Sequence, residues 1–294
     1  MFDASIALTD TAEHSPVPDF RQAYRLTKQT TRDYTISSVR NALRLLCAFS
    51  PSEPELGVSE LARRLDIGKS SVHRLLGTLK EEGFVEQSPT NGRYALGLRL
   101  LDLGAKAAAR LNLHEPALPY IEALYSRTGE TVVIAVLDGM EVVDVERRES
   151  PRSSRLSGRI GCRNSAHCTS TGKLLLAFLK PAELERRLTG YTLEAKTPST
   201  ITDHVVLREK LERIRERGYA TNLNESEIGI ASIAAPIRDA TGEVVAAISV
   251  AGALPRFEGP VAKDFITATV EAGRGISQRL GYRPIRVRPR QADA

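Results

Sequence analysis

Residues 69–79, KSSVHRLLGTL, hold side chains that suit contact with a nucleic acid. Hydroxyl groups, an imidazole and long cations can hydrogen-bond to base edges and to phosphates. Val72, Leu75, Leu76 and Leu79 recur at i, i+3, i+4 and i+7, so one helix face is expected to be apolar. The polar positions then share the opposite face, which we expect to contact DNA through Lys69, Ser70, Ser71, His73, Arg74 and Thr78. An ordinary helical subdomain with a leucine core is the alternative.

The segments before this helix predict a helix-turn-helix. A first helix is expected over Ser59–Leu65, with the Ser59 hydroxyl as N-cap. A turn at 66–69 leads to the second helix, which begins near Ser70. Asp66 stands where this turn most often has glycine, and aspartate tolerates the left-handed region better than most residues. A further helix is expected over residues 36–49.

The segment after the second helix predicts a wing. A strand begins at Phe84-Val85, residues 89–92 turn, and residues 93–96 return. Asn91-Gly92 is a hairpin signal because both residues tolerate positive φ. Arg93 follows the turn and is expected, with Lys69, to contact phosphate, while the hydroxyl-rich helix reads the major groove.

A second polar cluster, RNSAHCTSTG at residues 163–172, ends where a helix is expected to start. A helix N-terminus presents free amides and partial positive charge, which suit a carboxylate. Ser170, Thr171 and Gly172 would then cap an anionic small molecule. Ordinary N-capping by Thr169 or Ser170 is the alternative.

The same loop raises an enzymatic alternative. A hydrolase could use Cys168 as nucleophile with His167 as base, but sequence neighbours rarely have that geometry. Cys162, His167 and Cys168 could bind zinc, although a fourth ligand is missing. Thr171-Gly172-Lys173 lacks the other residues of a phosphate loop. We therefore expect no catalytic residue, no metal and no cofactor.

Composition bounds the class of protein. The chain has 294 residues, a net charge of +5 and three cysteines, which suits two domains in a reducing cytoplasm. The longest apolar run, residues 244–254, is too short to span a membrane. Residues 34–97 carry eight basic and seven acidic side chains, a net charge of +1. Binding to DNA at physiological salt would therefore need a homodimer or homotetramer to add phosphate contacts.

Five segments are expected along the chain. Their predicted ranges are a flexible extension over 1–33, a winged domain over 34–97, a linker helix over 98–113, an α+β domain over 114–282 and a basic tail over 283–294. Leu100, Leu103 and Ala107 on the linker could form a seam against a partner or pack on their own wing. Hairpins, one at Asp138-Gly139, alternate with helices in the second domain and indicate an antiparallel sheet.

The chain resembles the isocitrate-lyase-regulator (IclR) family of bacterial transcription factors. The matching segments are SVRNALRLLCAF, LARRLDIGKSSVHRLLGTLKEEGFVE, RYALGLRLLDLG, AHCTSTGKLLLAFL and the segment at 218–252. The resemblance implies a winged helix-turn-helix joined by the linker helix to a GAF-like effector domain. It implies a regulator of a catabolic gene cluster that binds an inverted-repeat operator in double-stranded DNA and responds to a small organic acid.

The resemblance also assigns positions of the effector pocket. The family's ligand contacts fall at the positions of Ser170, Thr171, Asn222, Ile230, Ser232, Ser249 and Ala251. Members that bind small 2-oxo acids tend to have an acid, a cysteine and two serines at four of these sites. This chain has Asn222, Ser232, Ser249 and Ala251 there, so one hydroxyl is lost, which argues against a glyoxylate- or pyruvate-like ligand and leaves room for a larger or aromatic acid. The alternative for Ser249 is a hydrogen bond within the sheet.

Overall fold

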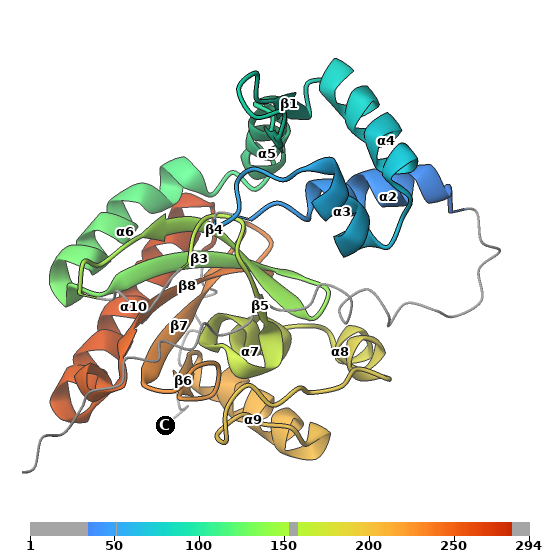
Figure 1. Cartoon of the computed structure of the whole chain (residues 1–294). Helices are drawn as coiled ribbons and strands as arrows, with labels where there is room; N and C mark the ends of the chain where they lie inside the picture. The colour runs from blue at the N-terminus through green and yellow to red at the C-terminus, as the bar shows by residue number, and fades with distance from the viewer. Residues whose placement is uncertain (1–34, 51, 153–157, 284–294) are drawn as a thin grey trace, which may run out of the picture. The chain divides into compact units, whose positions relative to one another are not determined.

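The computed structural model describes residues 35–50, 52–152 and 158–283. Residues 1–34 and 284–294, which hold the predicted extension and nearly all of the predicted tail, lie outside this part. The described chain combines helices with two antiparallel sheets (Figure 1). The predicted α+β class, with a winged helix-turn-helix at its N-terminal end, is confirmed.

The winged part consists of three helices and a hairpin. They are α2 (Ser37–Leu46), α3 (Val58–Leu65), α4 (Lys69–Glu81), β1 (Val85–Gln87) and β2 (Tyr94–Leu96). Leu45, Leu61, Val72 and Leu76 are fully buried and form a core of their own. Leu56, also fully buried, adds a bridge to Tyr94 beside the hairpin. Because these contacts join all the elements, α4 is held with its polar face outward.

The helix-turn-helix turn has the predicted conformation, but the predicted cap is wrong. Asp66 ends α3 with φ 56° and ψ 50°, in the left-handed region. Helix α3 begins at Val58, one residue before Ser59, and Gly57 is its N-cap without a side-chain hydrogen bond. Ser59 therefore lies inside the first turn. The main chain of Gly57 accepts from Leu61 N at 3.0 Å, so α3 starts without a capping hydroxyl.

The wing turn differs from a two-residue hairpin. Gly92 has φ +68°, but Asn91 does not have a positive φ. A longer loop joins the strands, closed by Ser88 N donating to Arg93 O at 2.8 Å. The Asn91 side chain accepts from Arg93 N at 2.9 Å and donates to Glu55. Asn91 therefore stabilises the wing through its amide and not through its backbone conformation.

Helix α5 (Arg99–Ala109) occupies most of the predicted linker and buries none of its residues. Of the three predicted seam residues, Leu103 is 45% exposed and Ala107 is exposed, whereas Leu100 is half-buried. Leu103 and Ala107 are therefore free to meet a partner, while Leu100 is partly covered within the chain.

The second part is built on a six-stranded antiparallel sheet. Its strand order is β5-β4-β3-β8-β7-β6. The strands are β3 (Thr131–Asp138), β4 (Glu141–Arg148), β5 (Arg163–Ser165), β6 (Ala220–Leu223), β7 (Ile230–Arg238) and β8 (Val244–Ala253). Strand β5 was not predicted. Asp138 pairs with Glu141, so the first hairpin turns at Gly139-Met140, one residue later than predicted.

Helices cover both faces of this sheet (Figure 1). One face packs on α6 (His114–Thr128) and α10 (Gly259–Arg279). The other packs on α7 (Ser170–Ala177), α8 (Pro181–Leu188) and α9 (His204–Arg217). Since successive residues of a strand point to opposite faces, β7 and β8 contribute to both cores. None of the described helices is long and apolar enough to cross a membrane.

Candidate nucleic-acid interface and effector site

Helix α4 exposes every residue predicted on its polar face. Val72 and Leu76 are fully buried, and the exposed set is Lys69, Ser70, Ser71, His73, Arg74 and Thr78. Within the described residues, the side chains of Ser70, Ser71, His73 and Arg74 have no hydrogen-bond partner. The Thr78 hydroxyl donates to Arg74 O at 3.2 Å and is partly occupied. The sequence pattern thus produces a helix whose donors are free to meet a ligand outside the protein.

Arg93 has a different environment from the one expected for a residue of the wing tip. Its guanidinium donates to Glu55 O at 2.8 Å and to the Glu60 carboxylate at 3.0 Å. Glu60 also accepts from Arg64, on the same helix. These contacts turn the Arg93 side chain back towards α3, so it ties the wing to the helix-turn-helix. A phosphate contact by Arg93 would have to compete with Glu60.

The predicted effector residues of the sheet come together on the face covered by α7. Asn222 pairs with Ser232, and Ser232 pairs with Ala251. Ser249 alternates with Ile248 and Val250, which belong to the core on the other face. Ile230 is buried at the start of β7 on the same side as Ser232. Residues spread over thirty positions therefore share one surface, as the family resemblance implies.

The start of α7 faces this surface. Thr169 is the N-cap, and its hydroxyl accepts from Gly172 N at 3.1 Å. Ser170 is bound instead across the site, with its Oγ 2.7 Å from Ser232 Oγ. The main-chain amides of Ser170 and Thr171 have no hydrogen-bond partner within the described chain. Capping by a side chain thus falls to Thr169 alone, which leaves the two main-chain amides without a partner at the helix end.

Gly172 allows α7 to approach the preceding turn. A Cβ atom at this position would lie 2.3 Å from the Cα of Ala166, which is closer than atoms can pack. The short 3-10 turn at Ala166–Cys168 is therefore in direct contact with the helix backbone. Gly172 positions the helix end and does not itself offer a side chain to a ligand.

Two largely buried residues at the site carry hydroxyls without a hydrogen-bond partner in the described chain. Ser249 is 4% exposed and Thr171 is 7% exposed. Neither oxygen is among the fully enclosed, unpartnered side-chain atoms of the described residues, so solvent or a ligand can reach both. The alternative that Ser249 bonds within the sheet does not match this geometry. Both hydroxyls remain available to a polar ligand.

Asn222 makes two hydrogen bonds within the protein. Its Oδ1 accepts from Glu225 N at 2.8 Å and its Nδ2 donates to Ser226 Oγ at 2.7 Å. The amide therefore shapes the loop after β6, and only its remaining hydrogen-bonding capacity could reach a ligand. Ala251 is half-buried at the rim of the same surface.

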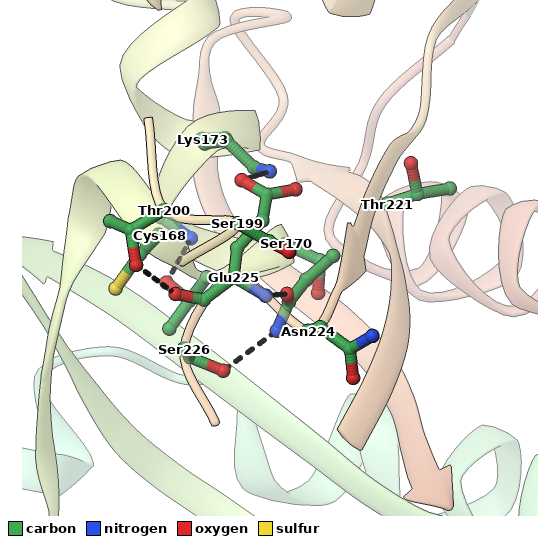
Figure 2. Close-up of polar contacts among 12 residues, drawn as sticks. Cys168, Ser170, Lys173, Ser199, Thr200, Thr221, Asn224, Glu225 and Ser226 are labelled. Carbon is green, nitrogen blue, oxygen red and sulfur yellow. Dashed lines mark hydrogen bonds and ion pairs between the residues drawn. The ribbon is translucent and has the colours of Figure 1, made fainter. Parts of the chain in front are cut away.

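Sequence reasoning missed a buried ion pair beside the site. Lys173 on α7 contacts the carboxylate of Glu225, and the Lys173 side chain is fully buried (Figure 2). Burial lowers the pKa of Lys173, and the Glu225 charge acts in the opposite direction. The signal was present, because a lysine within the apolar run GKLLLAF needs a buried partner. The partner lies 52 residues away, beyond the reach of local patterns.

The Cys–His pair of the enzymatic alternative is not assembled. His167 Nε2 donates to Glu194 O at 3.0 Å, and the Cys168 thiol donates weakly to Ser165 O. Burial raises the pKa of Cys168 to about 11, so its thiolate is scarce at neutral pH. The His167 Nδ1 has no hydrogen-bond partner among the described residues, so no carboxylate orients the ring. The described residues also include no group of three metal-ligating side chains close enough to hold an ion.

A surface cavity of about 350 Å³ lies elsewhere on this domain. It is lined by Phe178, Lys180 and Glu183, which follow the C-terminal end of α7, and by Arg238 and Glu243 of the β7–β8 hairpin. None of the predicted effector residues lines it. We place the candidate effector site at the start of α7, because the free amides and unbonded hydroxyls lie there.

The winged helix-turn-helix and the separate α+β domain together define a DNA-binding transcriptional regulator. Two family descriptions match the chain: the IclR helix-turn-helix domain over residues 38–89 and the bacterial transcriptional regulator IclR C-terminal domain over residues 105–278. The chain therefore belongs to the IclR family of bacterial transcriptional regulators. This membership decides against the enzymatic alternative.

Individual relatives agree with the family. The HTH-type transcriptional regulator XynR of Escherichia coli (strain K12) is 34% identical over 247 residues, covering 84% of this chain and 98% of its own. The crystal structure of Thermotoga maritima IclR has a TM-score of 0.70 at 32% identity and covers 84% of this chain and 100% of its own. An IclR homologue from Microbacterium hydrocarbonoxydans, solved in complex with 4-hydroxybenzoate, has a TM-score of 0.74 at 28% identity. That match covers 83% of this chain and 98% of the homologue.

Proposed function

We propose that this protein is a cytoplasmic, effector-responsive regulator of a catabolic operon. It binds an inverted-repeat operator as a homodimer or homotetramer and responds to a small organic acid. The observation that carries the proposal is the polar face of α4, because its donors are exposed and unbonded while its leucines are buried. Ser70, Ser71, His73 and Arg74 would read the major groove, and Lys69 would hold a phosphate.

The charge of the winged part supports an oligomer. Residues 34–97 carry a net charge of only +1, so one copy offers few phosphate contacts. Exposed apolar side chains on two helices are available to a second copy. Ile36, Val39 and Leu43 form one stripe along α2 and its N-cap, and Leu98, Leu101 and Leu103 are exposed on the N-cap and first turns of α5. Their burial in an oligomer would bring two recognition helices onto one operator.

The site at α7 supports an organic acid as effector. Two unbonded main-chain amides and the start of a helix favour a carboxylate. Ser249 and Thr171 add hydroxyls that can meet further oxygen atoms of the ligand, and Ile230 and Ala251 add apolar surface. The Microbacterium homologue binds 4-hydroxybenzoate. An acid with an aromatic body therefore fits the proposal better than a small 2-oxo acid.

Selection of operator sequences tests this function. The full chain is incubated with random duplex DNA, and bound fragments are recovered and sequenced. We expect an enriched inverted repeat whose half-sites are separated by one or more helical turns. A thermal-shift screen of organic acids then identifies the effector, because a ligand that binds only the folded state raises its stability. Recovery of no common sequence would contradict the proposal.

A further inference from the structure

Lys173 has more hydrogen-bond donors than the protein uses. A lysine ammonium carries three N–H groups. Within the described chain, the only acceptor for the Lys173 ammonium is the Glu225 carboxylate, and the side chain has no exposure to solvent. Two of its donors are therefore buried without an acceptor. Desolvating a charged donor without pairing it is costly, so this position favours binding of a further acceptor.

The position of Lys173 connects it with the candidate effector site. Lys173 and Ser170 are three residues apart on α7, so they lie on the same side of the helix. Ser170 reaches across the site to Ser232, and Figure 2 shows Ser170, Lys173 and Glu225 in one cluster. An acid bound by the free amides at the helix start is thus adjacent to the ammonium.

The loop that carries Glu225 is fixed through its main chain. Glu225 N donates to Asn222 Oδ1 at 2.8 Å. Glu225 O accepts from the Thr200 hydroxyl at 2.6 Å (Figure 2). Thr197 donates to Asn224 O. Ser226 is half-buried, and Glu227 and Ile228 beyond it are exposed. Rotation of the Glu225 side chain out of the ion pair would therefore not require these main-chain hydrogen bonds to break.

We propose that Lys173 is the residue that recognises the effector carboxylate, and that Glu225 occupies its ammonium when the effector is absent. This inference rests on the proposed function, since it concerns the same site. Two carboxylates next to one buried ammonium repel each other, so the arriving acid displaces Glu225. The ligand then gains an ion pair with a cation that is already desolvated, in addition to the contacts with helix amides and hydroxyls.

The test measures the thermal stability of the full chain carrying Glu225→Ala, in which the Lys173 ammonium has lost its partner. Acetate serves as the minimal carboxylate that could replace the missing side chain. We expect the melting temperature of the variant to fall in sodium chloride and to recover in sodium acetate at equal ionic strength. Acetamide, which is neutral and has nearly the same shape, should not restore it. Glu227→Ala removes an exposed charge from the same loop and serves as the matched control, with no response specific to acetate.

A second pair of variants keeps the test decisive if Glu225→Ala folds poorly. Glu225→Gln retains the shape of the side chain and removes its charge, and we expect it to bind acetate at least tenfold more tightly than the wild type. Lys173→Met should abolish the preference for acetate over acetamide, whereas Lys180→Met, at an exposed position, should preserve it.

The inference would be overturned if chloride and acetate stabilised Glu225→Ala and Glu225→Gln equally, or if both variants stayed unfolded in acetate. In each case an external carboxylate does not reach the ammonium, and the pair is purely structural. Operator binding by the wild type is measured separately. If acetate has no effect but the wild type binds its operator, only the role of Lys173 is refuted. If the wild type binds no operator, only the proposed function is refuted.

Discussion

The Ser170 hydroxyl on α7 lies 2.7 Å from the Ser232 hydroxyl on β7. This hydrogen bond joins the helix start to the sheet across the candidate effector site, between residues 62 positions apart. In this contact one hydroxyl donates and the other accepts, so one O–H group and the remaining lone pairs stay available to a ligand.

Arg74→Ala should weaken operator binding by about 1–3 kcal/mol and relax discrimination at one base position per half-site. The guanidinium is exposed and unbonded on the face of α4 opposite the buried leucines. The measurement is a titration at fixed salt with the selected operator and with single-base variants of it. Arg213→Ala, an exposed arginine of the other domain, is the control. Unchanged affinity for Arg74→Ala would refute the groove assignment.

Operator binding should fall steeply with salt and should depend on oligomerisation. A fragment spanning residues 34–97 contains its own core, so it can be compared with the full chain. We expect the full chain to show about twice the log–log salt slope of the monomeric fragment, because two copies release about twice as many counterions. Nanomolar binding by the monomeric fragment would contradict the proposed need for a second copy.

Ser249→Leu should abolish the effector response and leave operator binding intact. The larger side chain would crowd the face covered by α7 and remove an unbonded hydroxyl, while the winged core is separate. Overpacking is expected to cost about 1–3 kcal/mol of stability, so folding is checked by circular dichroism. Val245→Leu adds volume to the same strand at a position that is 39% exposed and is the control. A wild-type response in Ser249→Leu would place the pocket elsewhere.

Gly172→Ala should destabilise the second domain by about 1–3 kcal/mol, because the new Cβ atom would overlap the Ala166 backbone. Gly77→Ala in α4 should have the opposite effect on stability. No atom lies within 4 Å of the place where the alanine Cβ would stand, so this substitution should stabilise the helix by about 0.4–1 kcal/mol. Urea denaturation of both variants measures the two effects. Equal stability of Gly172→Ala and the wild type would mean that the turn at 166–168 can move away.

Cys168 should react slowly with iodoacetamide in the native protein. Burial keeps the thiol at 2% exposure and raises its pKa to about 11, so little thiolate is present near neutral pH. Cys47, which is exposed, provides the internal comparison. Peptide mass mapping after timed alkylation should show Cys47 modified first, and unfolding should remove the difference. Faster modification of Cys168 would restore the nucleophile interpretation.

Features encoded by neighbouring residues could be predicted from the sequence. The leucine spacing of α4 and the left-handed Asp66 depend on local periodicity and backbone preference, and both match the structure. The Asn91-Gly92 turn differs in detail from the prediction, since Asn91 has no positive φ and its side chain bonds to Arg93 N and to Glu55, 36 residues away. The binding of Arg93 by Glu60 and of Lys173 by Glu225 depends in the same way on tertiary contacts, which no local pattern contains.

The pairing of Lys173 with Glu225 also bears on selectivity among the anions of a cell. Because Glu225 balances the charge of Lys173, the pair contributes no net charge to the site without effector. A chloride or phosphate ion that enters the site is therefore not attracted by an unpaired ammonium. An inorganic ion brings too little apolar surface to offset the rotation of Glu225 and the loss of the ion's own hydration shell. An organic acid can offset both through the body attached to its carboxylate. The ion pair would thus make the site selective for an organic acid over inorganic anions.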